Sequence, residues 1–207
     1  MKYYLKQGVF PFIYLLMMAM IAFGIISISG LLWLKIILAI LNIALYGVVV
    51  SAVSYKEGQE SVKVRHANDL ERMQIIKTGE NRPLKIHEEY KPWKGFIFGF
   101  TACVPLIVLL GLHTVLYLST GEYRGLGAIA GLIYLMFFIF FIFGAATSAG
   151  EAAAGATLPW YTFYGALIAL PVIMLMTGIS YLIGAKKIIR QYEMINDRQR
   201  QIYGDRI

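Results

Sequence analysis

The sequence has little of what a disulfide-bonded, metal-binding or soluble domain contains. Its single cysteine, Cys103, lies within an apolar run, which excludes a disulfide framework and a cysteine-based metal site. Charged residues make up only 15% of the chain, whereas hydrophobic residues make up 58%. This composition is typical of membrane proteins. We therefore expect an all-helical integral membrane protein with a single membrane domain.

Motifs that would identify a reaction are also missing. The chain contains no P-loop, no G-x-G-x-x-G fingerprint and no G-x-S-x-G nucleophile elbow. His87 is followed by two glutamates, but the second histidine of the H-E-x-x-H zinc motif is absent. The sequence thus predicts no metal and no cofactor, and it favours a non-catalytic role over an enzymatic one.

Five apolar runs have about the length that a helix needs to cross a bilayer, roughly 20 residues at ~1.5 Å each. They are residues 9–27, 34–53, 96–118, 126–143 and 162–183. The first run is longer than the apolar region of a typical signal peptide, and no clear small-residue cleavage pattern ends it. We therefore interpret it as a retained span.

Residues 55–94 form the long polar segment between the second and third runs. They hold nine of the nineteen Lys and Arg residues and seven of the twelve Asp and Glu residues. Apolar residues from Glu57 to Thr78 fall near one helical face, and Gly79 is a typical stop, so the second span is expected to continue into water as a helix. The positive-inside bias places this segment and the N-terminus in the cytoplasm, at a bacterial-type cell membrane.

Aromatic and basic residues at the ends of the apolar runs predict where the membrane interfaces lie. The expected interface anchors are Trp33, Lys35, Trp93, Lys94, Trp160, Lys186 and Lys187. Because basic residues flank the apolar runs, the formal net charge of +7 indicates membrane topology and membrane lipids as partners, and not nucleic acid.

Two signals conflict over the side of the basic tail, residues 185–207. Five spans that start inside place this tail outside, whereas the cluster of Lys186, Lys187 and Arg190 is typical of an inside end. A sixth, shortened crossing through residues 144–159 would bring the tail inside.

The spacing of Ser148 and Glu151 bears on that choice, because it matches a capping box. It predicts a short helix of about ten residues, roughly half of a span. We therefore favour a short interfacial helix and five spans over six.

Three polar residues are candidates for an intramembrane or interfacial site. Glu151 carries a carboxylate among small residues, where it is either a helix cap or a functional group. Asn42 lies near the middle of the second span, and its amide needs an interhelical or ligand partner. His113 lies in the last turns of the third span, where it either binds a proton or ligand or is simply hydrated.

Glycines at four-residue spacing predict close contacts between helices. The pair Gly95 and Gly99 opens the third span, and Gly127 and Gly131 lie in the fourth. We interpret these pairs mainly as packing within the chain, with a homo-oligomer as the lesser alternative.

The leading functional hypothesis is a membrane subunit or scaffold that docks a protein partner or anionic lipid through residues 55–94 or 185–207. The alternative is a small-solute transporter or its substrate-binding membrane component, with Glu151, Asn42 and two proline kinks at a midplane site. A lipid-modifying enzyme is the third possibility.

Overall fold

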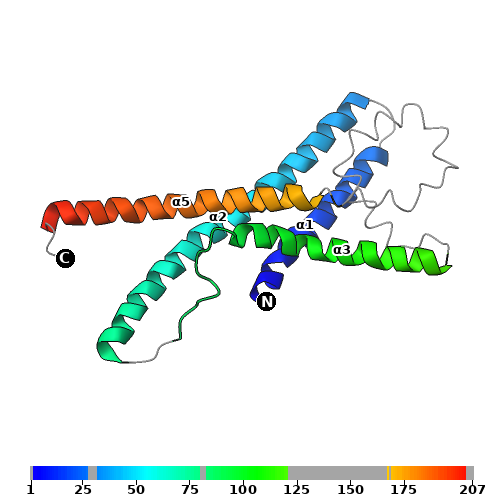
Figure 1. Cartoon of the computed structure of the whole chain (residues 1–207). Helices are drawn as coiled ribbons and strands as arrows, with labels where there is room; N and C mark the ends of the chain where they lie inside the picture. The colour runs from blue at the N-terminus through cyan, green and yellow to red at the C-terminus, as the bar shows by residue number, and fades with distance from the viewer. Residues whose placement is uncertain (1, 28–31, 80–82, 121–166, 168, 204–207) are drawn as a thin grey trace.

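The computed structural model describes residues 2–27, 32–79, 83–120, 167 and 169–203, and within these ranges the regular structure is helical, without strands. Figure 1 shows the helices, which are α1 (Lys2–Ser27), α2 (Leu32–Thr78), α3 (Lys94–Thr120) and α5 (Ala169–Tyr203). The helical fold class predicted from the sequence is confirmed for these ranges.

Three helices in the described part of the chain are long and apolar enough to cross a membrane. They are Trp33–Thr78, Lys94–Ser119 and Ala169–Gln201, and a shorter apolar helix covers Gly8–Ala22. The predicted span 126–143 and most of the first turns of 162–183 lie outside the described residues.

The second span continues into the polar segment without interruption. α2 has 47 residues, which corresponds to about 70 Å of helix, more than twice the thickness of the hydrocarbon core. The helix stops where the sequence predicted, because Gly79 adopts a φ of 72° and its N–H donates to the carbonyl of Ile75 at 2.8 Å. α5 likewise joins an apolar half to the basic tail in one helix of 35 residues.

α2 and α5 run in the same general direction, cross each other at an angle (Figure 1) and are in contact where they cross. Three contacts in order along α2 show this direction. Gly47 lies against Met176, and Gly58 lies against the backbone of Tyr181. Val62 packs in a cluster with Ile188. The order of contacts is the same on both helices, so their polar halves extend from the same end of the bundle.

α1 and α3 run in the opposite direction. α1 is antiparallel to α2, since Tyr14 stacks on Tyr46 while Met18 meets Asn42, nearer the start of α2. α3 is antiparallel to α5, since its Gly95 lies against Tyr181 and its Gly99 lies against Thr177 and Met174. Each of the four helices in the described ranges contacts two of the others.

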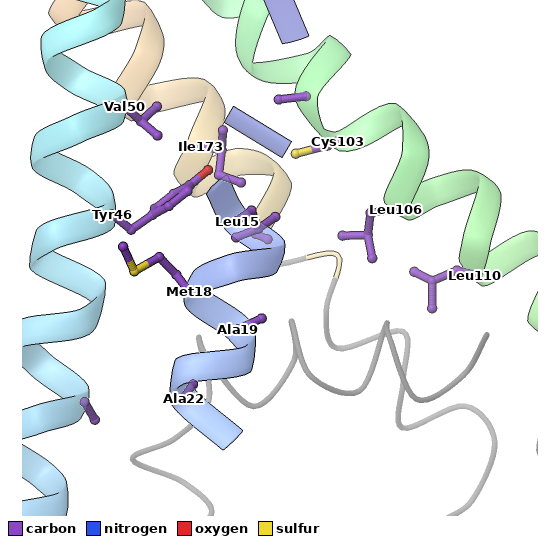
Figure 2. Close-up of a cluster of buried hydrophobic side chains, with 13 residues drawn as sticks. Leu15, Met18, Ala19, Ala22, Tyr46, Val50, Cys103, Leu106, Leu110 and Ile173 are labelled. Atoms are coloured by element: carbon purple, nitrogen blue, oxygen red, sulfur yellow. The ribbon is translucent and has the colours of Figure 1, made fainter. Parts of the chain in front are cut away.

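The apolar halves of the helices meet in one hydrophobic core. Figure 2 shows Leu15 of α1, Tyr46 of α2, Leu106 of α3 and Ile173 of α5 in this cluster, and each is fully buried. The outer surface is also apolar, and its large exposed side chains include Leu41, Leu45, Val48, Val108, Val115, Leu118, Leu175 and Ile183. A surface of this kind is unusual in water and suits lipid.

Candidate polar site at the junction of α2, α3 and α5

α2, α3 and α5 change from apolar to charged sequence at one level of the bundle. The change follows Val53 on α2 and Ile183 on α5, and these positions are adjacent because Gly184 packs against the backbone of Tyr55. α3 begins at this level, since Gly95 near its start lies against α5. We call this level the junction.

The fully buried side chain of Lys94 lies at the junction. Its Nζ donates a hydrogen bond to Oγ of Ser61 on α2 at 3.1 Å and another to the backbone carbonyl of Glu88 at 2.9 Å. The amine also lies 5.7 Å from the centroid of the Phe98 ring, within cation–π range. One side chain thus links α3, α2 and the connector, which we define as residues 83–93.

The surroundings of Lys94 offset part of the cost of burying a charge. Desolvation is the largest effect on its charged form and disfavours it, whereas the carboxylates of Glu57 and Glu88 favour it and the neighbouring Lys91 opposes it. A substitution that removes the amine also removes a donor from a buried hydroxyl and a backbone carbonyl. The site is therefore sensitive to truncation of Lys94.

Tyr181 joins α5 to the same junction. Its buried ring stacks against Tyr90 at 5.8 Å between centroids, and it meets the Phe98 ring edge-on at 6.1 Å. Tyr90 is itself fixed to α2, because its backbone N–H donates to the carbonyl of Ser61 at 3.0 Å. The connector is thus held between α2 and α5.

Further contacts dock the connector on the polar half of α2. Oε1 of Glu89 accepts hydrogen bonds from Nδ2 of Asn68 at 2.8 Å and from Nη2 of Arg72 at 2.6 Å. Asn68 is only 3% exposed, and its Oδ1 accepts from the backbone N–H of Lys85 at 3.4 Å. The connector therefore follows α2 back to the junction along a chain of polar contacts.

Glycines let the helices approach closely at the junction. Gly58 of α2 and Gly184 of α5 form a reciprocal contact, in which a Cβ on either residue would overlap a backbone carbonyl of the other helix. Gly95 and Gly99 lie against α5 with equally little space. The packing role predicted for this last pair is confirmed.

Beyond the junction, α2 and α5 stay in contact for about three turns and then diverge (Figure 1). Val62 packs with Ala185 and Ile188, and the rings of His66 and Tyr192 stack with 4.4 Å between their centroids. These contacts hold the two charged helices together outside the apolar core.

The same two helix faces remain apolar where the helices diverge. Met73 lies eleven residues, or about three turns, after Val62 and is 61% exposed; Ile195 lies seven residues, or about two turns, after Ile188 and is 51% exposed. We use the term fork for the exposed apolar residues on these two arms, which are Leu70, Met73 and Ile76 of α2 and Ile195 of α5.

Two of the three candidate residues for a midplane site, Asn42 and His113, lie in the described part of the chain. Nδ2 of Asn42 donates to the carbonyl of Met18 at 2.9 Å, so its amide serves the contact between α1 and α2. His113 is only 1% exposed and lies near the Tyr117 ring, which places it inside the bundle and not at a hydrated interface. Glu151 lies outside the described residues.

The predicted interface anchors differ in their placement. Trp33, Trp93, Lys186 and Lys187 are exposed, and Lys35 is half-buried. Lys94 was predicted to be an exposed anchor at the interface, whereas its side chain is buried at the junction, where Ser61 and the Glu88 carbonyl accept its hydrogen bonds. Trp160 lies outside the described residues.

The sequence carried one signal for the junction that composition alone does not reveal. Ser54, Ser61 and Asn68 recur every seven residues along α2, and all three are buried. Small polar residues at this spacing lie on one helical face, as apolar residues do in a coiled coil. Two of the three, Ser61 and Asn68, lie where α2 contacts the connector.

Comparisons with protein-family models, with curated proteins and with solved structures found no match to this chain.

Proposed function

We propose that the chain is an integral membrane protein in which α2 and α5 cross the bilayer in the same direction. Their parallel packing through Gly58 and Gly184 supports this orientation. The continuous apolar runs of both helices end at the junction, and most of their charged residues follow it. The tail after Lys187 then emerges on the same side as residues 55–94, which the positive-inside bias assigns to the cytoplasm.

This orientation favours an even number of spans. The five-span arrangement favoured from the sequence puts residues 185–207 on the side opposite to residues 55–94, which two parallel crossing helices do not allow. Of the two arrangements considered, six spans has the required parity. Residues 126–143 and 144–159 lie outside the described residues, so the proposal rests on α2 and α5 alone.

The function that this geometry supports best is that of a membrane scaffold or subunit that docks a protein partner. The proposal rests on the fork. Near the junction the apolar faces of α2 and α5 pack against each other, whereas farther from it the same faces are exposed. Ile76 is 83% exposed, although it lies in a polar helix. An exposed apolar stripe on a charged helix is typical of a surface that receives an amphipathic helix.

The position of the fork favours a protein over lipid. Met73 lies 18 residues past Tyr55, which is roughly 27 Å along the helix and exceeds the depth of a headgroup layer, about 5–8 Å. We therefore propose a soluble or membrane-attached partner that inserts an apolar helical face between the two arms.

Site-specific cross-linking tests this proposal in the native cells. A photo-reactive residue at Met73 is expected to give one cross-linked product of defined mass, while the same residue at Gln74, which is exposed on another face, is expected to give little. Met73→Glu is expected to weaken binding of the identified partner about thirtyfold, the effect of losing one interface hot spot of about 2 kcal/mol. Equal products from both positions would contradict docking in the fork.

Transport is the second candidate, and the burial of His113 is the observation that favours it. An ionisable residue inside a helical membrane bundle is often functional. This candidate predicts that His113→Gln and Glu151→Gln lower uptake of a labelled solute by cells while insertion of the protein stays unchanged. The scaffold proposal predicts normal solute uptake in both of these variants. It predicts reduced recovery of the partner only in variants of the fork residues.

A further inference from the structure

A shallow groove opens between α2 and α5 on the apolar side of the junction. Its volume is ≈ 230 Å³, and it is lined by Ser51, Ala52, Tyr55, Ser180 and Ile183. The lining therefore includes two serines, whose hydroxyl groups are hydrogen-bond donors and acceptors, among apolar and aromatic residues.

A cation lies beside this groove. Nζ of Lys187 is 5.9 Å from the centroid of the Tyr55 ring, and Tyr55 is one of the groove residues. Lys186 is also exposed but has no described contact with the groove. Lys56 is engaged with Glu60 at 3.9 Å, so Lys187 is the cation that the described contacts connect to the groove.

Apolar side chains continue from the groove toward the middle of the bundle. Val48 is 65% exposed on α2, and Ile179 and Ile183 are 51% and 57% exposed on α5. Val48 and Ile179 precede the groove on their helices and Ile183 lines it, whereas Lys187 follows it. From the middle of the bundle outward, the surface therefore presents apolar side chains, then the serines, then the lysine.

We propose that this groove binds the headgroup of an anionic phospholipid, with the phosphate near Lys187, the serine hydroxyls on phosphate or glycerol oxygens, and the acyl chains along the exposed residues of α2 and α5. The proposal is based on the order of groups along this surface. A phospholipid presents apolar chains, ester groups and an anionic headgroup in the complementary order. Charge complementarity selects an anionic headgroup over a zwitterionic one, since the described contacts give the groove a cation and no carboxylate.

This inference rests on the proposed membrane orientation, but it does not depend on a partner at the fork. Lipid binding is measured on the purified full chain in a non-ionic detergent, whereas the fork is tested by cross-linking at Met73. A failure of one test therefore leaves the other unaffected.

The experiment titrates the detergent-solubilised chain with fluorescent phosphatidylglycerol and, separately, fluorescent phosphatidylcholine. Lys187→Gln is expected to weaken phosphatidylglycerol binding about fivefold, the effect of one lysine near an anionic lipid. It is expected to weaken phosphatidylcholine binding less, because the choline cation offsets the phosphate charge of that lipid. Lys186→Gln removes the same charge one residue away and is the matched control, expected to change binding less than twofold. Ser180→Leu fills the groove and is expected to weaken binding of both lipids, while unfolding at an unchanged temperature shows that it still folds.

Three results would overturn the proposal. Equal losses in Lys187→Gln and Lys186→Gln would show attraction to general surface charge and not to the groove. Unchanged binding in both Lys187→Gln and Ser180→Leu would show that lipid binds elsewhere. Displacement of the phosphatidylglycerol probe by millimolar inorganic phosphate alone would assign the site to a free anion.

Discussion

The apolar half of the bundle and the junction are held together in different ways. In the apolar half, Leu15, Tyr46 and Ile173 fill a core, and Asn42 donates an interhelical hydrogen bond across it. At the junction, a buried lysine and close glycine contacts connect three helices and the connector. Dispersion contacts tolerate exchange of apolar side chains of similar volume, whereas buried polar groups and backbone contacts tolerate few changes.

The largest effect is expected where backbones touch. Gly58→Val places a side chain against the Tyr181 carbonyl, so α2 and α5 must separate, and we expect a loss of about 3 kcal/mol or more in the free energy of unfolding. Thermal unfolding in detergent measures it. Gly111→Val is the control, because its Cβ has open space within 4 Å. Equal destabilisation by both variants would contradict the close contact at the junction.

Truncation of the buried lysine is expected to come next. Lys94→Ala removes the donor to Ser61 and to the Glu88 carbonyl and leaves a cavity, for an expected loss of about 3 kcal/mol. Lys91→Ala removes an exposed lysine from the same segment and is expected to stay within about 0.5 kcal/mol. If the two variants unfold at the same temperature, Lys94 is not a structural link.

A smaller effect is expected in the apolar half. Asn42→Leu keeps the side chain's approximate size but breaks the hydrogen bond to the Met18 carbonyl, which should cost about 1 kcal/mol. The same unfolding measurement applies, with Leu41→Val on the exposed face as the control. A loss as large as that of Lys94→Ala would erase the contrast between the two regions.

The smallest global effect is expected at the outer end of the connector. Arg72→Gln breaks a partly exposed ion pair with Glu89, worth at most about 1 kcal/mol. Because Glu89 helps to dock the connector, hydrogen exchange should quicken in residues 83–93 while the unfolding temperature hardly changes. Unchanged exchange there would show that Asn68 alone is enough to hold Glu89.

Local patterns predicted much of the fold. The apolar runs predicted the positions of the long helices, and Gly79 predicted the end of α2. Both predictions succeed because they depend only on residues close together in the sequence. The burial of Lys94 was not predicted, since an interfacial anchor and a buried link have the same sequence context. Its position depends on Ser61 and Glu88, which only the tertiary structure brings near.

Topology is the other point that the sequence left open between two arrangements. The capping-box spacing in residues 144–159 favoured five spans, whereas the basic residues after Ile183 favoured six. Neither pattern contains information about the direction of a neighbouring helix. The contacts of α5 with α2 supply that direction. The recurrence of Ser54, Ser61 and Asn68 is a signal that a heptad search of polar residues would detect.

The most direct test of the account asks whether the charged ends of α2 and α5 lie on the same side of the membrane. Single cysteines at Gln74 and Gln199, both exposed, are introduced into a Cys103→Ser background and labelled in intact cells and in opened cells with an impermeant thiol reagent. We predict that both positions are protected in intact cells and labelled after opening. Labelling of Gln199→Cys in intact cells, with Gln74→Cys still protected, would contradict the parallel crossing of α2 and α5.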